Sequence, residues 1–241
     1  MAVDALWTNL GDWTATTDYT AAATALAVRV GEAAALGPRD CVVDYACGYG
    51  DSLRLWVERF GVRRVVGVEP DPGVCERVRA RIAGWGLSDC VSIVTSRAER
   101  LAPRRAAADV SAVVCVDGAY HFRTRLAWWQ MLAAELPAST RMAACDVVMA
   151  DGQRPQFLLR LIARAMHIPA ENLVDAQSLR SSLAALGLHR LELTSIGNAV
   201  LDGFAAHAPR RGIATRVTRG SLRALRARGV IDYVIVHAGR S

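Results

Sequence analysis

The sequence has no apolar stretch long enough to cross a membrane. Its longest hydrophobic segments have the length of a strand and are interrupted by charges, whereas a membrane-spanning helix needs roughly 20 apolar residues in a row. The N-terminus carries Asp4 where a secretory signal peptide would have a basic start, and no unbroken apolar core follows. We therefore expect a cytoplasmic protein that makes no contact with a membrane.

Paired cysteines are also missing. The six cysteines stand singly, mostly inside apolar segments, and none belongs to a C-x-x-C pair of the kind that binds zinc or exchanges disulfides. Buried free thiols are therefore the simplest interpretation.

Aromatic residues make up only 6% of the chain and do not alternate with basic residues, so no base-stacking surface for nucleic acid is indicated. The net charge of +6 comes from arginines spread through an Ala- and Arg-rich chain. A nucleic-acid partner is therefore not expected. The densest basic group fits a solvated helix face and an anion-binding patch equally well, and it comprises Arg210, Arg211, Arg216, Arg219, Arg223, Arg226 and Arg228.

The chain is long and apolar enough for a sizeable core: 52% of its 241 residues are hydrophobic, and one domain is expected to span 1–241. Helical and strand-like segments alternate, which is typical of a mostly parallel sheet with helices on both faces. The predicted fold is α/β, Rossmann-like and doubly wound. The predicted strands are 41–44, 65–68, 91–95, 110–116, 142–148, 190–195 and 231–237, and the predicted helices are 18–35, 51–60, 73–85, 126–136 and 177–186.

Three segments lie outside this alternation. Residues 1–38 are expected to form an N-terminal helical arm or lid, and 153–175 and 198–229 to form lid insertions over the carboxyl ends of the strands. One insertion carries an apolar stripe at helical spacing that fits ordinary core better than a lid over a large acceptor, and its members are Phe157, Leu158, Leu161, Ile162, Ala165 and Met166.

A glycine-rich turn follows the first predicted strand. Asp44 ends this strand, and Gly48 and Gly50 would let the backbone approach a ligand at the start of the next helix. Any tight strand-to-helix turn favours glycine, so this motif alone is ambiguous. The second strand ends in Glu69, about 20 residues later, where doubly wound folds place an acceptor for ribose hydroxyls. Together the two motifs predict a binding site for a cofactor that contains ribose.

With these motifs the chain resembles the class I S-adenosylmethionine-dependent methyltransferases, especially their small-molecule and natural-product branch. Residues 42–50 are similar to the family's first motif, 68–71 to its acidic strand end and 113–122 to its fourth-strand motif. Residues 231–236 resemble the closing antiparallel strand, and 9–13 resemble the N-terminal lid. The resemblance implies a seven-stranded, mostly parallel sheet with an antiparallel last strand and helical lid insertions.

The resemblance also implies S-adenosylmethionine as cofactor and S-adenosylhomocysteine as product. Two positions depart from the family. Ala46 replaces a loop glycine, which is tolerable if its backbone angle is ordinary, and the acid that usually follows the third strand has no clean counterpart. Ser96 or the backbone around Ala98 would contact adenine instead. The expected cofactor-binding residues are Trp13, Tyr19, Asp44, Ala46, Cys47, Gly48, Gly50, Glu69, Pro70, Ala98, Glu99 and Asp117.

Three other classes of enzyme fit less well. A Rossmann dehydrogenase would need a third glycine where Leu53 stands, and a base-methylating enzyme would carry an Asn/Asp-Pro-Pro-Tyr-like loop in place of 117–120. Magnesium-dependent methyltransferases cluster carboxylates with an amide, whereas Asp146 is followed by Val147, so no metal ligands are expected.

The expected reaction moves a methyl group to an oxygen or nitrogen of a small, partly apolar organic acceptor in natural-product biosynthesis; a carbon acceptor is also compatible. His121 is the expected general base, because its ordinary pKa near 6.5 suits proton removal at neutral pH. Asp146 would orient His121 or accept the proton itself, as the resemblance to related enzymes implies, although catalysis by proximity alone stays open. An RNA or protein methyltransferase, a catalytically silent S-adenosylmethionine-binding module and a homodimer are also compatible with the sequence.

Overall fold

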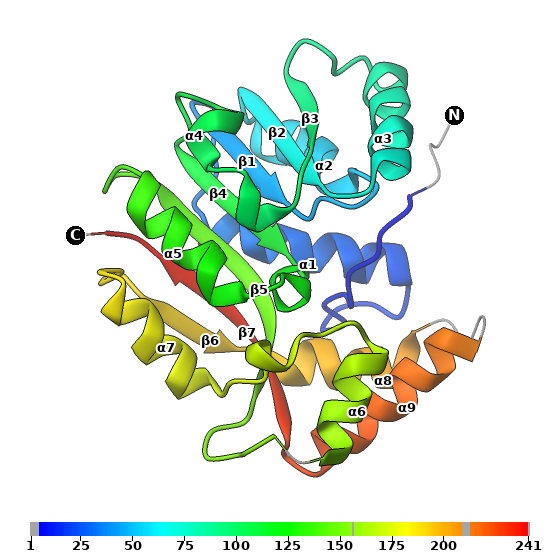
Figure 1. The fold of residues 1–241 in the computed structure, drawn as a ribbon. Coiled ribbons are helices and arrows are strands. Elements are labelled where there is room, and N and C mark those ends of the chain that lie inside the picture. Colours follow the sequence, from blue (N-terminus) through cyan, green and yellow to red (C-terminus); the bar gives the residue numbers. More distant parts are fainter. Residues whose placement is uncertain (1–4, 156, 209–212, 241) are drawn as a thin grey trace.

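The computed structural model describes residues 5–155, 157–208 and 213–240, which form a twisted sheet with helices on both faces (Figure 1). The sheet has seven strands in the order β3-β2-β1-β4-β5-β7-β6, and β7 runs antiparallel to the other six. This arrangement confirms the predicted fold class. The strands are β1 (Cys41–Tyr45), β2 (Arg64–Glu69), β3 (Val91–Thr95), β4 (Ala112–Val116), β5 (Arg141–Met149), β6 (Glu192–Ser195) and β7 (Ile231–Ala238).

The helices begin where the sequence offers a side chain to accept their first free amide groups. Asp18, Asp71, Thr124 and Asp175 each accept a hydrogen bond from a backbone amide three residues later. The helices are α1 (Tyr19–Ala33), α2 (Asp51–Phe60), α3 (Pro72–Gly84), α4 (Pro103–Ala106), α5 (Arg125–Glu135), α6 (Phe157–Ala165), α7 (Ala176–Ala185), α8 (Gly203–His207) and α9 (Ile213–Ala227). Shorter helical turns are η1 (Ala98–Arg100), η2 (Ala119–His121), η3 (Ala170–Asn172) and η4 (Asn198–Asp202).

The two faces of the sheet pack into separate apolar cores. One core joins the sheet to α1, α2, α3 and α9, with Leu26 and Trp56 fully buried in it. The other joins the sheet to α5 and α7 around Trp128 and Trp129. Every residue of β1 is buried, as expected for a central parallel strand covered on both sides.

The parallel register brings the carboxyl ends of three strands to one edge of the sheet. Tyr45 pairs with Val68 in β2, and Asp44 pairs with Val114 in β4, so the loops after these strands meet. The N-terminal segment crosses the same edge, where the backbone amide of Leu10 donates to the Asp117 carboxylate at 2.7 Å.

Both insertions contain helices, but the core interpretation of the apolar stripe on α6 is wrong for three of its members, because Phe157, Leu161 and Ala165 are exposed. Phe157 is 77% exposed and Leu161 is 48% exposed, because α6 turns Leu159 and Ala163 toward the core instead. The side chain of Leu158 lies outside the described residues. The role of either insertion as a lid stays a prediction.

The basic group near the C-terminus has internal partners. Arg219 donates to the carbonyl oxygens of Ala205 and Ala208 at the end of α8, and Arg226 pairs with Asp232 in β7. These two arginines therefore tie α9 to its neighbours and form no open anion patch. Arg210, Arg211 and the side chain of Arg216 lie outside the described residues.

All six cysteines are free thiols, five of them buried. Among the described helices, none is both long and apolar enough to span a bilayer.

Candidate functional site

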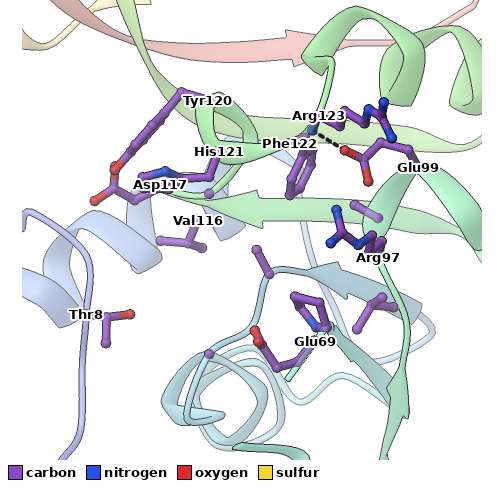
Figure 2. Close-up of a pocket in the computed structure, with 16 residues that line it drawn as sticks. Thr8, Glu69, Arg97, Glu99, Val116, Asp117, Tyr120, His121, Phe122 and Arg123 are labelled. Carbon is purple, nitrogen blue, oxygen red and sulfur yellow. Dashed lines mark hydrogen bonds between the residues drawn. The ribbon is translucent and has the colours of Figure 1, made fainter. Parts of the chain in front are cut away.

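A cavity of about 460 Å³ opens at the carboxyl ends of β1, β2 and β4. Figure 2 shows Asp117, Tyr120 and His121 at one end, Arg97, Glu99 and Arg123 at the other, and Glu69 between the two groups. Of the predicted cofactor residues, the cavity is lined by Ala46, Gly48, Glu69, Pro70, Ala98, Glu99 and Asp117. The turn after β1 and three strand ends therefore meet around one space, as the motifs predicted.

The turn after β1 is left-handed at three positions. Gly48 and Gly50 have φ of +52° and +85°, which glycine adopts without strain. Ala46 has φ of +58°, so the condition under which alanine would be tolerated at this position without strain is not met. A residue with a Cβ pays about 1–2 kcal/mol for this conformation. The amides of Ala46 and Cys47 both donate to the Val68 carbonyl of β2, at 2.8 and 3.4 Å, which holds the start of the loop against the sheet.

The methyl group of Ala46 is accommodated by a glycine on the neighbouring loop. A Cβ built on Gly118 would lie 2.6 Å from the Ala46 Cβ, which is far inside normal contact distance. The lack of a side chain at Gly118, in the loop after β4, therefore makes room for the alanine in the first turn.

Glu69 ends β2 with its carboxylate facing the cavity (Figure 2). The side chain is half-buried, and its Oε1 accepts a hydrogen bond from the Asp71 amide at 3.2 Å. Burial raises the pKa of the carboxyl group above its ordinary value. A carboxylate has about four acceptor positions, so Glu69 can accept further donors from a ligand.

Asp117 joins three parts of the chain. Its Oδ2 accepts from the Leu10 amide at 2.7 Å, and its Oδ1 accepts from the Tyr233 hydroxyl in β7 at 2.6 Å. Burial raises its pKa to about 7. Tyr233 was not predicted as a site residue, because its strand gave no sign of facing the loop after β4.

His121 lies on η2 at the cavity wall, with its Nδ1 3.3 Å from the carbonyl oxygen of His167. The carbonyl can only accept, so in this hydrogen bond Nδ1 carries the proton and the neutral ring leaves Nε2 as an acceptor. The residue is exposed overall, but the cavity wall desolvates the imidazole and holds its pKa below the ordinary value. His121 is therefore in the protonation state that a general base needs.

Asp146 does not make the expected contact with His121. It is 1% exposed in β5, and its Oδ2 lies 2.6 Å from the Arg125 guanidinium. Burial raises the pKa of the Asp146 carboxyl, and the Arg125 charge opposes that rise. The prediction of direct orientation fails because Arg125, from the start of α5, reaches the carboxylate from inside the core.

Five predicted cofactor residues lie behind the cavity wall. The Trp13 indole donates to the Leu10 carbonyl at 2.8 Å, and the Tyr19 hydroxyl lies 2.9 Å from the carbonyls of Trp7 and Asn9. These two aromatic residues bind the backbone of the N-terminal segment and do not line the cavity.

The others lie in or beneath the first turn. Asp44 is fully buried and accepts from the Trp56 indole at 2.7 Å, and burial raises its pKa to about 6. Gly50 caps α2, and Cys47 lines a smaller neighbouring pocket under the N-terminal segment. Asp44 does not line the cavity, because its carboxylate is turned toward Trp56, and its contact with the cofactor stays a prediction.

The cavity also contains residues that sequence reasoning missed. Arg97 and Arg123 place positive charge beside Glu99, whose carboxylate accepts a hydrogen bond from the Arg123 amide (Figure 2). Arg97 lies in the segment after β3, where the acidic residue usual in the family is missing. That missing acid was the sequence signal that this end of the cavity carries a different charge. Within the described residues no group of three or more His, Cys, Asp or Glu side chains could hold a metal, and metal independence stays a prediction.

All residues that line this cavity except Thr8 lie in a segment that matches a known protein family. Residues 42–151 match the family described as a methyltransferase domain. Trans-aconitate 2-methyltransferase from Rhizobium rhizogenes (strain K84) is 44% identical over 45 residues, which cover 19% of this chain. The matched segment spans only 18% of that relative's length.

Two solved structures show the same fold. Geranyl diphosphate C-methyltransferase from Streptomyces coelicolor A3(2), in complex with Mg²⁺, geranyl diphosphate and S-adenosyl-L-homocysteine, superposes with a TM-score of 0.76 at 16% identity, covering 91% of this chain and 81% of that chain. Phosphoethanolamine N-methyltransferase 2 from Haemonchus contortus, in complex with S-adenosyl-L-methionine, gives 0.74 at 11% identity, covering 89% and 52%. The predicted methyltransferase resemblance is confirmed at the level of domain and fold.

Proposed function

We propose, from the match of residues 42–151 to a methyltransferase domain and from the class I methyltransferase fold of the chain, that this protein transfers a methyl group from S-adenosylmethionine to a small organic acceptor. The observation that carries the proposal is the single cavity that joins the left-handed turn after β1 to the carboxylates of Glu69 and Asp117.

The residues present fit the cofactor. Glu69 has acceptor capacity for the two ribose hydroxyls, and Gly48 leaves the turn without a side chain between backbone and ligand. Pro70 and Ala98 would give apolar walls for adenine, and Glu99 lines the same cavity. When bound, the cofactor supplies a methyl group activated by a sulfonium, so the chain has only to orient the acceptor, exclude water and remove a proton.

The acceptor atom that we propose is an oxygen or a protonated nitrogen, because His121 is placed to take a proton. Its Nδ1 is engaged by the His167 carbonyl, so Nε2 is the atom that would receive it. Val116, Tyr120 and Phe122 make this part of the wall apolar and aromatic, which suits a partly apolar acceptor of the kind found in natural-product biosynthesis.

Titration calorimetry with S-adenosylhomocysteine tests the cofactor site. Replacing Glu69 by Ala removes charge-assisted hydrogen bonds worth about 1.5–3 kcal/mol, so affinity should fall roughly tenfold to over a hundredfold. Glu76→Ala, an exposed carboxylate on α3, is the matched control and should bind like the parent protein. Equal affinity of Glu69→Ala and the parent would refute the ribose assignment.

Transfer of a labelled methyl group tests the reaction. We expect label in small phenols, hydroxy acids or amines, and none in RNA or protein. Label only in RNA or protein would replace the small-molecule proposal. Tight binding of S-adenosylhomocysteine without transfer to any acceptor would indicate a binding module in place of an enzyme.

A further inference from the structure

The insertion after β5 holds the turn that carries His121. This turn, η2, is contacted at three points by residues of one short segment, His167 to Asn172. The His167 carbonyl lies 3.3 Å from the His121 Nδ1, and the Asn172 side chain reaches the backbone on both sides of the histidine. A segment expected to act as a lid therefore also bears directly on the proposed base.

Asn172 uses all of its amide group for this contact. Its Nδ2 donates to the carbonyl oxygens of Tyr120 at 2.9 Å and Phe122 at 2.8 Å, which are the residues before and after His121. Its Oδ1 accepts from the Arg125 amide at 2.9 Å. The residue is 4% exposed, so these bonds are shielded from water. The backbone of His121 is thus fixed on both sides by one side chain.

Asn172 is itself held by buried residues of the core. The Arg125 guanidinium donates to the Asn172 carbonyl at 2.8 Å and to the Val147 carbonyl at 2.9 Å, and its charge is balanced by Asp146. Arg125 and Asp146 are both almost fully buried. Asp146 therefore does not touch the histidine; it is linked to this turn through Arg125 and Asn172, and its carboxyl also interacts with the Tyr120 backbone.

We propose that Asn172 is a positioning residue that, with the His167 carbonyl, selects the tautomer of His121 that carries its proton on Nδ1 and leaves Nε2 free to accept one. The proton from the acceptor would then bond to Nε2, while the Nδ1 proton stays in its hydrogen bond to His167. The use of Nε2 as a base rests on the proposed function, but the selection of the tautomer does not.

Nitrogen-15 NMR of histidine-labelled protein tests this selection without any turnover. The full chain is measured as the parent, as Asn172→Asp and as Asn198→Asp, and His121→Gln identifies the His121 signal. Asn172→Asp keeps the size and the oxygen facing Arg125 but replaces the two donated hydrogen bonds with a carboxylate oxygen against two carbonyls. Asn198, an exposed residue of η4 bonded to Arg226, is the matched control.

We expect the parent and Asn198→Asp to show His121 protonated on Nδ1, and Asn172→Asp to show a mixture with protonation on Nε2. In the transfer assay kcat of Asn172→Asp should fall roughly tenfold to a hundredfold with an unchanged KM for S-adenosylmethionine, since only the alignment of the base is lost.

Two results would overturn the proposal. The first is a parent protein in which His121 is protonated on Nε2, and this measurement does not depend on the folding of any variant. The second is an Asn172→Asp protein in which His121 has the same tautomer as in the parent. A changed tautomer in Asn172→Asp together with full turnover of His121→Ala supports the positioning role and removes only the general base from the proposed function.

Discussion

Replacing Gly118 by Ala should destabilise the protein through a single collision with Ala46. The new methyl group would lie 2.6 Å from the Ala46 Cβ and 3.3 Å from the Cys115 Sγ. Overpacking of this kind costs typically about 1–3 kcal/mol. For a domain of this size each kcal/mol lowers Tm by roughly 2–4 °C.

The partner substitution, Ala46→Gly, acts in the opposite direction. It removes about 1–2 kcal/mol of left-handed strain, and the greater freedom of glycine in the unfolded chain offsets about 0.5–1 kcal/mol of that gain. It also removes the methyl group that Gly118→Ala would strike, so that only the 3.3 Å contact with Cys115 is left. The double variant should therefore be more stable than the sum of the single changes predicts, by about 1–2 kcal/mol.

Urea unfolding of the parent, the two single variants and the double variant measures this coupling. Gly84→Ala, whose added methyl group would meet no atom within 4 Å, controls for the general effect of removing a glycine. Additivity to within about 0.5 kcal/mol would refute the predicted collision between the Ala46 methyl group and a methyl group at position 118.

Two further predictions concern the charged groups of the cavity. His121→Ala should lower turnover by about 10²–10⁴-fold while leaving the affinity for S-adenosylhomocysteine nearly intact, and a variant that keeps more than about a third of parental turnover would remove His121 from the mechanism. The pKa of Asp117 is raised from 3.8 to about 7 on folding, so the folded state binds more protons between these values and this group's contribution to stability is lost as pH rises through 7. Asp117→Asn should flatten the decline of Tm with pH over this window, and an unchanged slope in thermal scans from pH 4 to 8 would contradict the assignment.

The features that could be predicted from sequence were those that depend on residues close together in the chain. Alternating apolar segments gave the strands and helices to within a few residues, and the glycines with Glu69 located the cavity, because strand ends in parallel register must meet. The backbone angle of Ala46 has no such signal, since alanine favours no left-handed turn and its conformation is imposed by neighbours.

Errors arose where a side chain's partner came from a distant element. Asp146 was assigned to His121 because its strand lies beside the fourth strand and because the resemblance to related enzymes implies this pair. In the structure its partner is Arg125, at the start of α5. Trp13 and Tyr19 were placed on the cofactor by resemblance, whereas their hydrogen bonds run to the N-terminal segment itself. Such side-chain pairs depend on how helices and strands pack against one another, and a short stretch of sequence does not indicate this packing.

The position of β7 has a consequence for how the protein is made. This strand is the last in sequence but lies inside the sheet, between β5 and β6, and β6 has no other strand partner among the described residues. Ribosomes add roughly 5–20 residues per second and N-terminal parts can fold first, yet this sheet stays divided until Ile231 to Ala238 have emerged. Because Tyr233 also holds Asp117, chains that stop before β7 would lack this support of the cavity, so the site is complete only after β7 has joined the sheet.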